Sequence, residues 1–133
     1  MRNLTNQQIV EQLYKYYAED NMKAALVFFD NDITWVRPGE PEIPFAGTFK
    51  GFEELGKMLA IQSATLKIKT FLPKKICADD DTVVALGVDT AVVIPTGKTY
   101  TSEWVQAFTF KNGKIIHVQV YMDTKTIADA FKD

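Results

Sequence analysis

The sequence predicts an α+β fold in which helices come first and consecutive antiparallel strands follow. Up to residue 62, most of the chain shows apolar residues at the spacing of a helix. From residue 66 onward apolar and polar residues alternate, and turn sequences at 95–97 and 112–113 divide this region into strands. We expect the 133 residues to form a single domain, residues 1–133, with its own hydrophobic core.

The first half of the chain should contain three helices. The first begins at a capping box, in which Thr5 is the N-cap residue and Gln8 lies three positions later, and it should end near residue 20. A second helix at 22–29 is apolar on almost every side, so we expect it to be well buried. A third helix at 52–62 carries a regular apolar face.

Five strands and a last helix complete the predicted order α-α-β-α-β-β-β-β-α. A short strand at 33–37 precedes the third helix, and the segment 38–47, rich in Pro and Gly, should be a loop. Pro73 predicts that the strand beginning at Leu66 is bent or lies at a sheet edge. The remaining elements are strands at 82–94, 99–110 and 115–122 and a helix at 124–131 behind the N-cap Asp123.

The length of the last turn decides which side chains of the final two strands share a face. A two-residue loop of Asn112 and Gly113 would mix polar and apolar residues on both faces. A three-residue loop at 111–113 pairs Phe108 with Ile116 and separates the two kinds of residue, so we predict this register. The inner face then carries Trp104, Gln106, Phe108, Val118, Val120 and Met122. The outer face carries Thr101, Glu103, His117, Gln119 and Tyr121.

Two polar side chains stand out on the predicted inner faces. Trp35 and Arg37 alternate with their neighbours along a strand and therefore share a face, and Gln106 lies in the middle of an apolar face. An arginine that points inward needs a carboxylate, a solvent-filled cavity or a ligand as its partner. Polar groups in aromatic and aliphatic surroundings are typical of a ligand pocket. The alternative for the arginine is a salt bridge within the protein, with Glu40, Glu42 or Asp89.

Asp89 and Tyr17 are the candidates for acid–base chemistry. Asp89 faces inward or outward depending on whether Gly87 forms a bulge, and the sequence leaves both possibilities open. If it faces inward, it is a natural partner or base beside Arg37. Tyr17 belongs to a tyrosine cluster on the first helix and can direct its hydroxyl into the pocket. His117 falls on the outer face, which favours a solvated or dimer-interface role over catalysis.

Composition excludes several classes of function. The net charge is −2 and the basic residues are scattered, so we expect no nucleic-acid partner. No apolar run approaches the roughly 20 residues of a membrane span, so we expect no membrane partner. The start MRNLTNQQ lacks the apolar segment of a secretion signal, and the single Cys77 cannot form an internal disulfide, which favours a cytoplasmic location. One histidine and one cysteine do not suffice for a typical zinc site, and we expect no metal and no cofactor.

Three segments resemble the SnoaL-like, ketosteroid-isomerase-related proteins of the NTF2-like superfamily. They are FFDNDITWVRPG, IPFAGTFKGFEEL and FTFKNGKIIHVQVYMDTKTIADAF, and the resemblance extends from Thr5 to Phe131. It implies an NTF2-like (cystatin-like) cone, in which a strongly curved antiparallel sheet wraps around the N-terminal helices and encloses a pocket. It also implies a homodimer that packs through the outer sheet face.

The resemblance argues against steroid isomerase activity. Ketosteroid isomerases use a tyrosine on the first helix, an aspartate base on the first strand and an aspartic acid on the penultimate strand. The matching positions are Leu13, Arg37 and Gln106, with Tyr14 and Tyr17 close to the first of them. Because a guanidinium does not lose its proton at neutral pH, it cannot act as the base.

Three functions remain open. The first is a pocket that binds a small, mostly apolar molecule whose anionic or carbonyl end is anchored by Arg37. The second is an isomerase, lyase or cyclase that uses an inward Asp89 or Tyr17, and the third is a non-catalytic dimerisation module. The expected ligand-binding residues are Tyr17, Trp35, Arg37, Trp104, Gln106, Phe108, Val118, Val120 and Met122.

Overall fold

The structure is a computed structural model that describes residues 4–133, so the first three residues of the MRNLTNQQ segment lie outside the described residues. The helices are α1 (Asn6–Ala18), α2 (Met22–Ala25), the 3-10 helix η1 (Leu26–Phe28), α3 (Gly51–Thr65) and α4 (Thr124–Phe131). The strands are β1 (Phe29–Arg37), β2 (Gly47–Lys50), β3 (Leu66–Asp79), β4 (Thr82–Val93), β5 (Thr99–Lys111) and β6 (Lys114–Met122).

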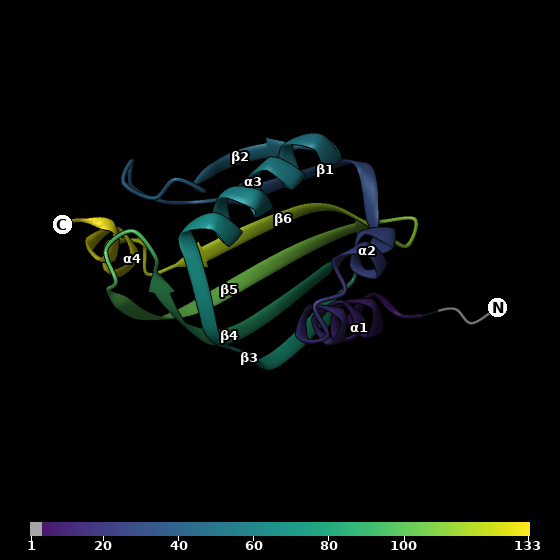
Figure 1. The fold of residues 1–133 in the computed structure, drawn as a ribbon. Helices are drawn as coiled ribbons and strands as arrows, with labels where there is room; N and C mark the ends of the chain where they lie inside the picture. The colour runs from purple at the N-terminus through teal and green to yellow at the C-terminus, as the bar shows by residue number, and fades with distance from the viewer. Residues whose placement is uncertain (1–3) are drawn as a thin grey trace.

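The six strands form one curved sheet in the order β2-β1-β6-β5-β4-β3. Figure 1 shows the long strands curving beneath α3, with α1 against one end of the sheet and α4 at the other end. Neighbouring strands are antiparallel except β1 and β6, which run parallel. The predicted α+β class and curved sheet are confirmed. The parallel pair was not predicted, because it joins strands from opposite ends of the chain, between which no local turn indicates direction.

The predicted order of elements holds, with η1 and β2 as additions. The helix expected at 22–29 is the short α2 followed by η1, and it is not well buried, since Val27 is 65% exposed. Phe29 already belongs to β1, which leaves too few residues for a longer helix. The last residue of the expected loop 38–47 begins β2, a four-residue edge strand with little burial and therefore little apolar pattern.

The turn between β5 and β6 differs from the predicted one but gives the same faces. It contains only Asn112 and Gly113, whose positive φ angles of 52° and 76° suit a two-residue hairpin. The register then shifts by one residue at Ile116, so that Phe108 pairs with Val118. The predicted pairing of Phe108 with Ile116 is therefore wrong by two residues. Because a shift of two preserves the alternation of side chains, the predicted inner and outer faces survive.

The orientation of Asp89 follows from the position of an irregularity in the sheet. The pairing of β4 with β5 is continuous from Thr82 to Val92, so Gly87 forms no bulge against β5. The register shifts instead in the pairing with β3, between Ile68 and Thr70 and between Pro73 and Lys75. The second shift is the bend that the proline led us to expect of an edge strand. Asp89 consequently lies on the inner face of β4, the orientation that the sequence left open.

Candidate functional site

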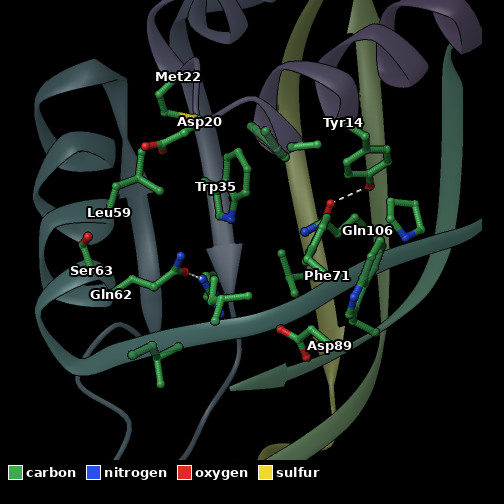
Figure 2. A pocket seen from close by; sticks show the side chains of 18 of the residues that line it. Tyr14, Asp20, Met22, Trp35, Leu59, Gln62, Ser63, Phe71, Asp89 and Gln106 are labelled. Atoms are coloured by element: carbon green, nitrogen blue, oxygen red, sulfur yellow. Dashed lines mark hydrogen bonds between the residues drawn. The ribbon is translucent and has the colours of Figure 1, made fainter. Parts of the chain in front are cut away.

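A cavity of about 820 Å³ lies on the concave side of the sheet, between α1, α3 and the inner faces of the long strands. Figure 2 shows the labelled side chains around this space. Eight residues predicted from the sequence line it: Tyr17, Trp35, Arg37, Asp89, Trp104, Gln106, Val120 and Met122. The structure therefore brings most of the expected site residues together. The role of these residues in ligand binding stays a prediction.

Phe108 and Val118 do not line the cavity, contrary to the prediction. Both are fully buried, although they share the inner face with the lining residues. The reason is that α1 covers this part of the sheet. The ring centroid of Tyr14, on α1, lies 6.2 Å from that of Phe108, in an edge-on arrangement. These two residues thus belong to the hydrophobic core beneath the site.

Arg37 is held at the end of β1 by uncharged groups. Its Nη1 donates a hydrogen bond to Oε1 of Gln62, on the last turn of α3. The guanidinium carbon lies 4.5 Å from the centre of the Phe45 ring, and Nη2 lies 3.7 Å from Sδ of Met122. Burial lowers the pKa of Arg37 to about 10, and the nearby Tyr100 and Asp89 oppose this shift, so the group keeps its charge at neutral pH.

The alternative of an internal salt bridge is not what the structure shows. Within residues 4–133, no carboxylate oxygen lies within 4.0 Å of the Arg37 guanidinium. Glu40 and Glu42 are exposed in the loop after β1. Asp89 is close enough to act on the pKa of Arg37 but does not form a pair with it. The cavity therefore contains a sheltered cation without a contacting anion.

Asp89 brings a carboxyl group to the same cavity. The residue is only 6% exposed, and its Oδ1 is buried without a hydrogen-bond partner in the described part of the chain. Burial raises the pKa of Asp89 to about 6, while the charge of Arg37 and a backbone hydrogen bond act in the opposite direction. A carboxyl group in this state can accept or release a proton close to neutral pH.

Tyrosine side chains of α1 form one wall of the cavity. Tyr14, which is not among the site residues predicted from the sequence, donates its hydroxyl proton to Oε1 of Gln106 at 2.6 Å (Figure 2). The hydroxyl of Tyr17 is buried without a partner within residues 4–133. Burial raises the pKa of both tyrosines well above the usual value, so both stay protonated at neutral pH. Leu13, at the position of the isomerase tyrosine, is fully buried in the core.

Gln62 and Phe71 are lining residues that sequence reasoning missed. Gln62 is three positions after Leu59 and seven after Leu55, so helical spacing alone places it on the apolar face of α3. Phe71 lies on the bent strand β3 and stacks on Trp104, with ring centroids 4.8 Å apart and planes 9° from parallel. Its position had no signal in the sequence, because it depends on the irregular pairing of β3.

Two further observations concern the described residues as a whole. They contain no group of three or more His, Cys, Asp and Glu side chains arranged to hold a metal ion. None of their helices is both long and apolar enough to cross a membrane.

Comparison with known proteins agrees with the fold. An NTF2-like protein from Burkholderia xenovorans is 30% identical, with a TM-score of 0.83 and 94% of each chain covered. An NTF2-like protein from Burkholderia thailandensis is 24% identical, with a TM-score of 0.89 and both chains fully covered. TerC, co-crystallised with polyporic acid, is 20% identical, with a TM-score of 0.84 and coverage of 95% of this chain and 97% of its own. No protein in the curated set matches. The SnoaL-like domain matches residues 10–118, and the chain therefore belongs to the SnoaL-like family of the NTF2-like superfamily.

Proposed function

We propose that this protein binds a small, mostly apolar molecule and holds its anionic or carbonyl end with Arg37. The observation that carries this proposal is the environment of the guanidinium. It contacts an amide, an aromatic ring and thioethers, yet no carboxylate within residues 4–133 contacts it. A sheltered charge without a counter-ion is unfavourable, and a ligand oxygen would remove part of this penalty.

The rest of the cavity supports an apolar ligand body. Its inner surface carries the indole rings of Trp35 and Trp104 and the side chains of Phe71, Val120 and Met122. Such a lining around one charged group is typical of a site that orients an apolar molecule by a single polar end. TerC shares the fold and was co-crystallised with polyporic acid, which makes organic acids the first probes to try.

Replacing Arg37 by methionine tests the proposal. A charge-assisted hydrogen bond contributes about 1.5 to 3 kcal/mol, so Arg37→Met should weaken the binding of apolar carboxylates about tenfold or more. Isothermal titration calorimetry with one-ring and two-ring aryl carboxylates and polyporic acid measures this loss. The corresponding aryl alcohols, which lack the charge, should lose much less affinity.

The matched control is Lys111→Met, which removes a positive charge from the exposed end of β5. It should leave probe binding as in the unmodified protein. Thermal unfolding of the ligand-free proteins completes the test. Arg37→Met should be as stable as the parent or more stable, whereas the loss of a true buried ion pair would lower stability by about 3 to 5 kcal/mol. Such a loss, or equal binding of the carboxylates by both proteins, would contradict anchoring by Arg37.

A second candidate function is acid–base catalysis on a carbonyl compound. It is favoured by one observation, the inward carboxyl of Asp89 with its pKa raised to about 6. In this reaction Asp89 takes a proton from the carbon next to a carbonyl group, and Arg37 stabilises the negative charge that develops on the oxygen. Tyr17 is unsuited as the base, because burial raises its pKa further above neutrality.

Proton exchange measures this candidate function directly. Aryl and cyclic ketones in D₂O should exchange their α-protons faster when the protein is present, as followed by proton NMR. Asp89→Asn should reduce this acceleration by about a hundredfold or more, because a positioned general base contributes at least that factor. An exchange rate that is the same with both proteins would exclude Asp89 as the base while leaving ligand binding untouched.

A second copy of the chain is the partner that we propose for the outer sheet face. Leu86 pairs with Val105 and Val105 with Tyr121, so three apolar side chains lie next to one another across β4, β5 and β6. Leu86 and Tyr121 are exposed in the single chain. An exposed apolar row of this kind is suited to an interface.

A further inference from the structure

The hydrogen bond between Tyr14 and Gln106 fixes the orientation of a buried amide. The hydroxyl of Tyr14 donates to Oε1 of Gln106 at 2.6 Å, and both side chains are buried. In this orientation the amide oxygen accepts the hydroxyl proton of Tyr14. The amide oxygen is therefore occupied, and Nε2 points away from Tyr14 (Figure 2). This nitrogen donates no hydrogen bond within residues 4–133, although Gln106 lines the cavity.

A second donor on the cavity wall is also unsatisfied. The indole Nε1 of Trp35 is buried and has no hydrogen-bond partner within the described part of the chain. Trp35 lies two residues before Arg37 on the same face of β1. A buried N–H group without an acceptor lowers the stability of the protein. The amide nitrogen of Gln106, which is not fully buried, is the donor that a ligand oxygen in the cavity can reach.

The sheet register places this amide at a defined distance from the arginine. Val36 of β1 pairs with Gln119 of β6, so Arg37 lies next to Val120 along the strand. Gln106 of β5 pairs with the same Val120 from the other side. The backbones of Arg37 and Gln106 are thus two strand spacings apart, about 10 Å. Val120 lines the cavity between them, and a molecule that rests on it can reach both side chains.

We propose that the cavity holds its ligand at two points, an acid group at Arg37 and a carbonyl oxygen at the amide of Gln106. The ligand class is a keto acid, or a related dioxygenated compound, whose two oxygen groups are separated by about one ring. This inference rests on the proposed function, because it needs the anchor at Arg37, and it adds the second subsite and the chemical class.

The test compares two probes of nearly equal shape. 4-Acetylbenzoate has a carboxylate and, across the ring, a carbonyl oxygen, whereas 4-isopropenylbenzoate has a CH₂ group in place of that oxygen. The unmodified protein should bind the acetyl compound about tenfold more tightly, since one hydrogen bond to the Gln106 amide separates the two probes. Isothermal titration calorimetry on the full chain gives both dissociation constants.

Variants assign the preference to the amide. Gln106→Met retains an unbranched side chain of similar length but has no donor, so the ratio of the two dissociation constants should fall to about one. Arg37→Met should weaken both probes and leave the ratio unchanged. Gln119→Met is the matched control, the same substitution on the opposite face of the sheet, and should bind as the parent does. If Gln106→Met folds poorly, the double variant Tyr14→Phe/Gln106→Met removes both ends of the buried hydrogen bond and takes its place.

The outcomes separate failure of the second subsite at Gln106 from failure of the anchor at Arg37. Equal affinities for the two probes in the unmodified protein, or a preference that persists without the Gln106 amide, would overturn the second subsite while the anchor at Arg37 stands. No measurable binding of either probe by the unmodified protein would overturn both. A preference that disappears only with the amide supports the two-point site.

Discussion

Asp89→Asn should make the protein more stable at pH 8 and leave its stability almost unchanged at pH 4. Burial raises the pKa of Asp89 from 3.8 to about 6, so its charged form is unfavourable in the folded protein. A change of this size in the pKa corresponds to about 3 kcal/mol. Asparagine has no charge to bury, but its amide also lacks partners there, so we expect a gain of about 1 to 3 kcal/mol at pH 8.

The direction in which stability changes with pH depends on whether the folded or the unfolded chain binds the Asp89 proton more tightly. The pKa of Asp89 is higher in the folded than in the unfolded chain, so the folded state holds the proton more tightly. The stabilisation that comes from protonated Asp89 is therefore complete below about pH 4, and it is lost as the pH rises towards 6 and above. Exposed carboxylates with lowered pKa values, such as Asp123 and Asp129, act in the opposite direction. They are present in both proteins and cancel in the comparison.

Chemical unfolding at a series of pH values from 4 to 8 measures the difference between the two proteins. Asp32→Asn, a change at an exposed aspartate of β1, is the matched control and should show no such pH-dependent gain. A stability difference between Asp89→Asn and the parent that is equal at pH 4 and pH 8 would contradict a buried, partly protonated carboxyl. A ligand carboxylate should also bind more tightly as the pH falls from 8 towards 6, because protonation of Asp89 removes a repelling charge from the cavity.

The faces of the sheet were predictable because they depend on local alternation. Trp104 and Gln106 differ by two positions, and any correct pairing places them on the same side. The capping box of Thr5 and Gln8 was predictable for the same reason, and both of its hydrogen bonds form. The exact pairing of Phe108 was not predictable. A two-residue loop followed by a bulge separates polar from apolar residues as well as a three-residue loop does.

The chemistry of the site depended on contacts that local patterns do not contain. Tyr14 and Gln106 are 92 positions apart, and their hydrogen bond exists only because α1 packs over β5. The inward orientation of Asp89 depends on the unbroken pairing of β4 with β5, which leaves the irregularity to the bent strand β3. Gln62 could have been found, since it continues the apolar face of a predicted helix. What the sequence lacked was the distance between elements, which decides which polar groups meet.

Gly87→Ala should destabilise the protein by about 3 kcal/mol, although the glycine lies in an ordinary strand conformation. A Cβ atom at this position would be 2.2 Å from Cζ2 of Trp104 and 2.6 Å from the backbone oxygen of Leu72. The indole cannot retreat freely, because it is buried and stacks on Phe71. Overpacking of a rigid core site costs typically 1 to 3 kcal/mol, and contact with backbone places this case at the upper end.

Gly56→Ala is the matched control for this effect. Gly56 lies within α3, and a Cβ atom there would have no neighbour within 4 Å, so alanine should raise stability by about 0.5 to 1 kcal/mol. The same substitution should thus act in opposite directions at the two glycines in chemical unfolding. Because Trp104 lines the cavity, Gly87→Ala should also weaken probe binding, whereas Gly56→Ala should not. Equal stability of the Gly87→Ala protein and the parent would show that Trp104 can move, and would remove the indole as a fixed wall of the site.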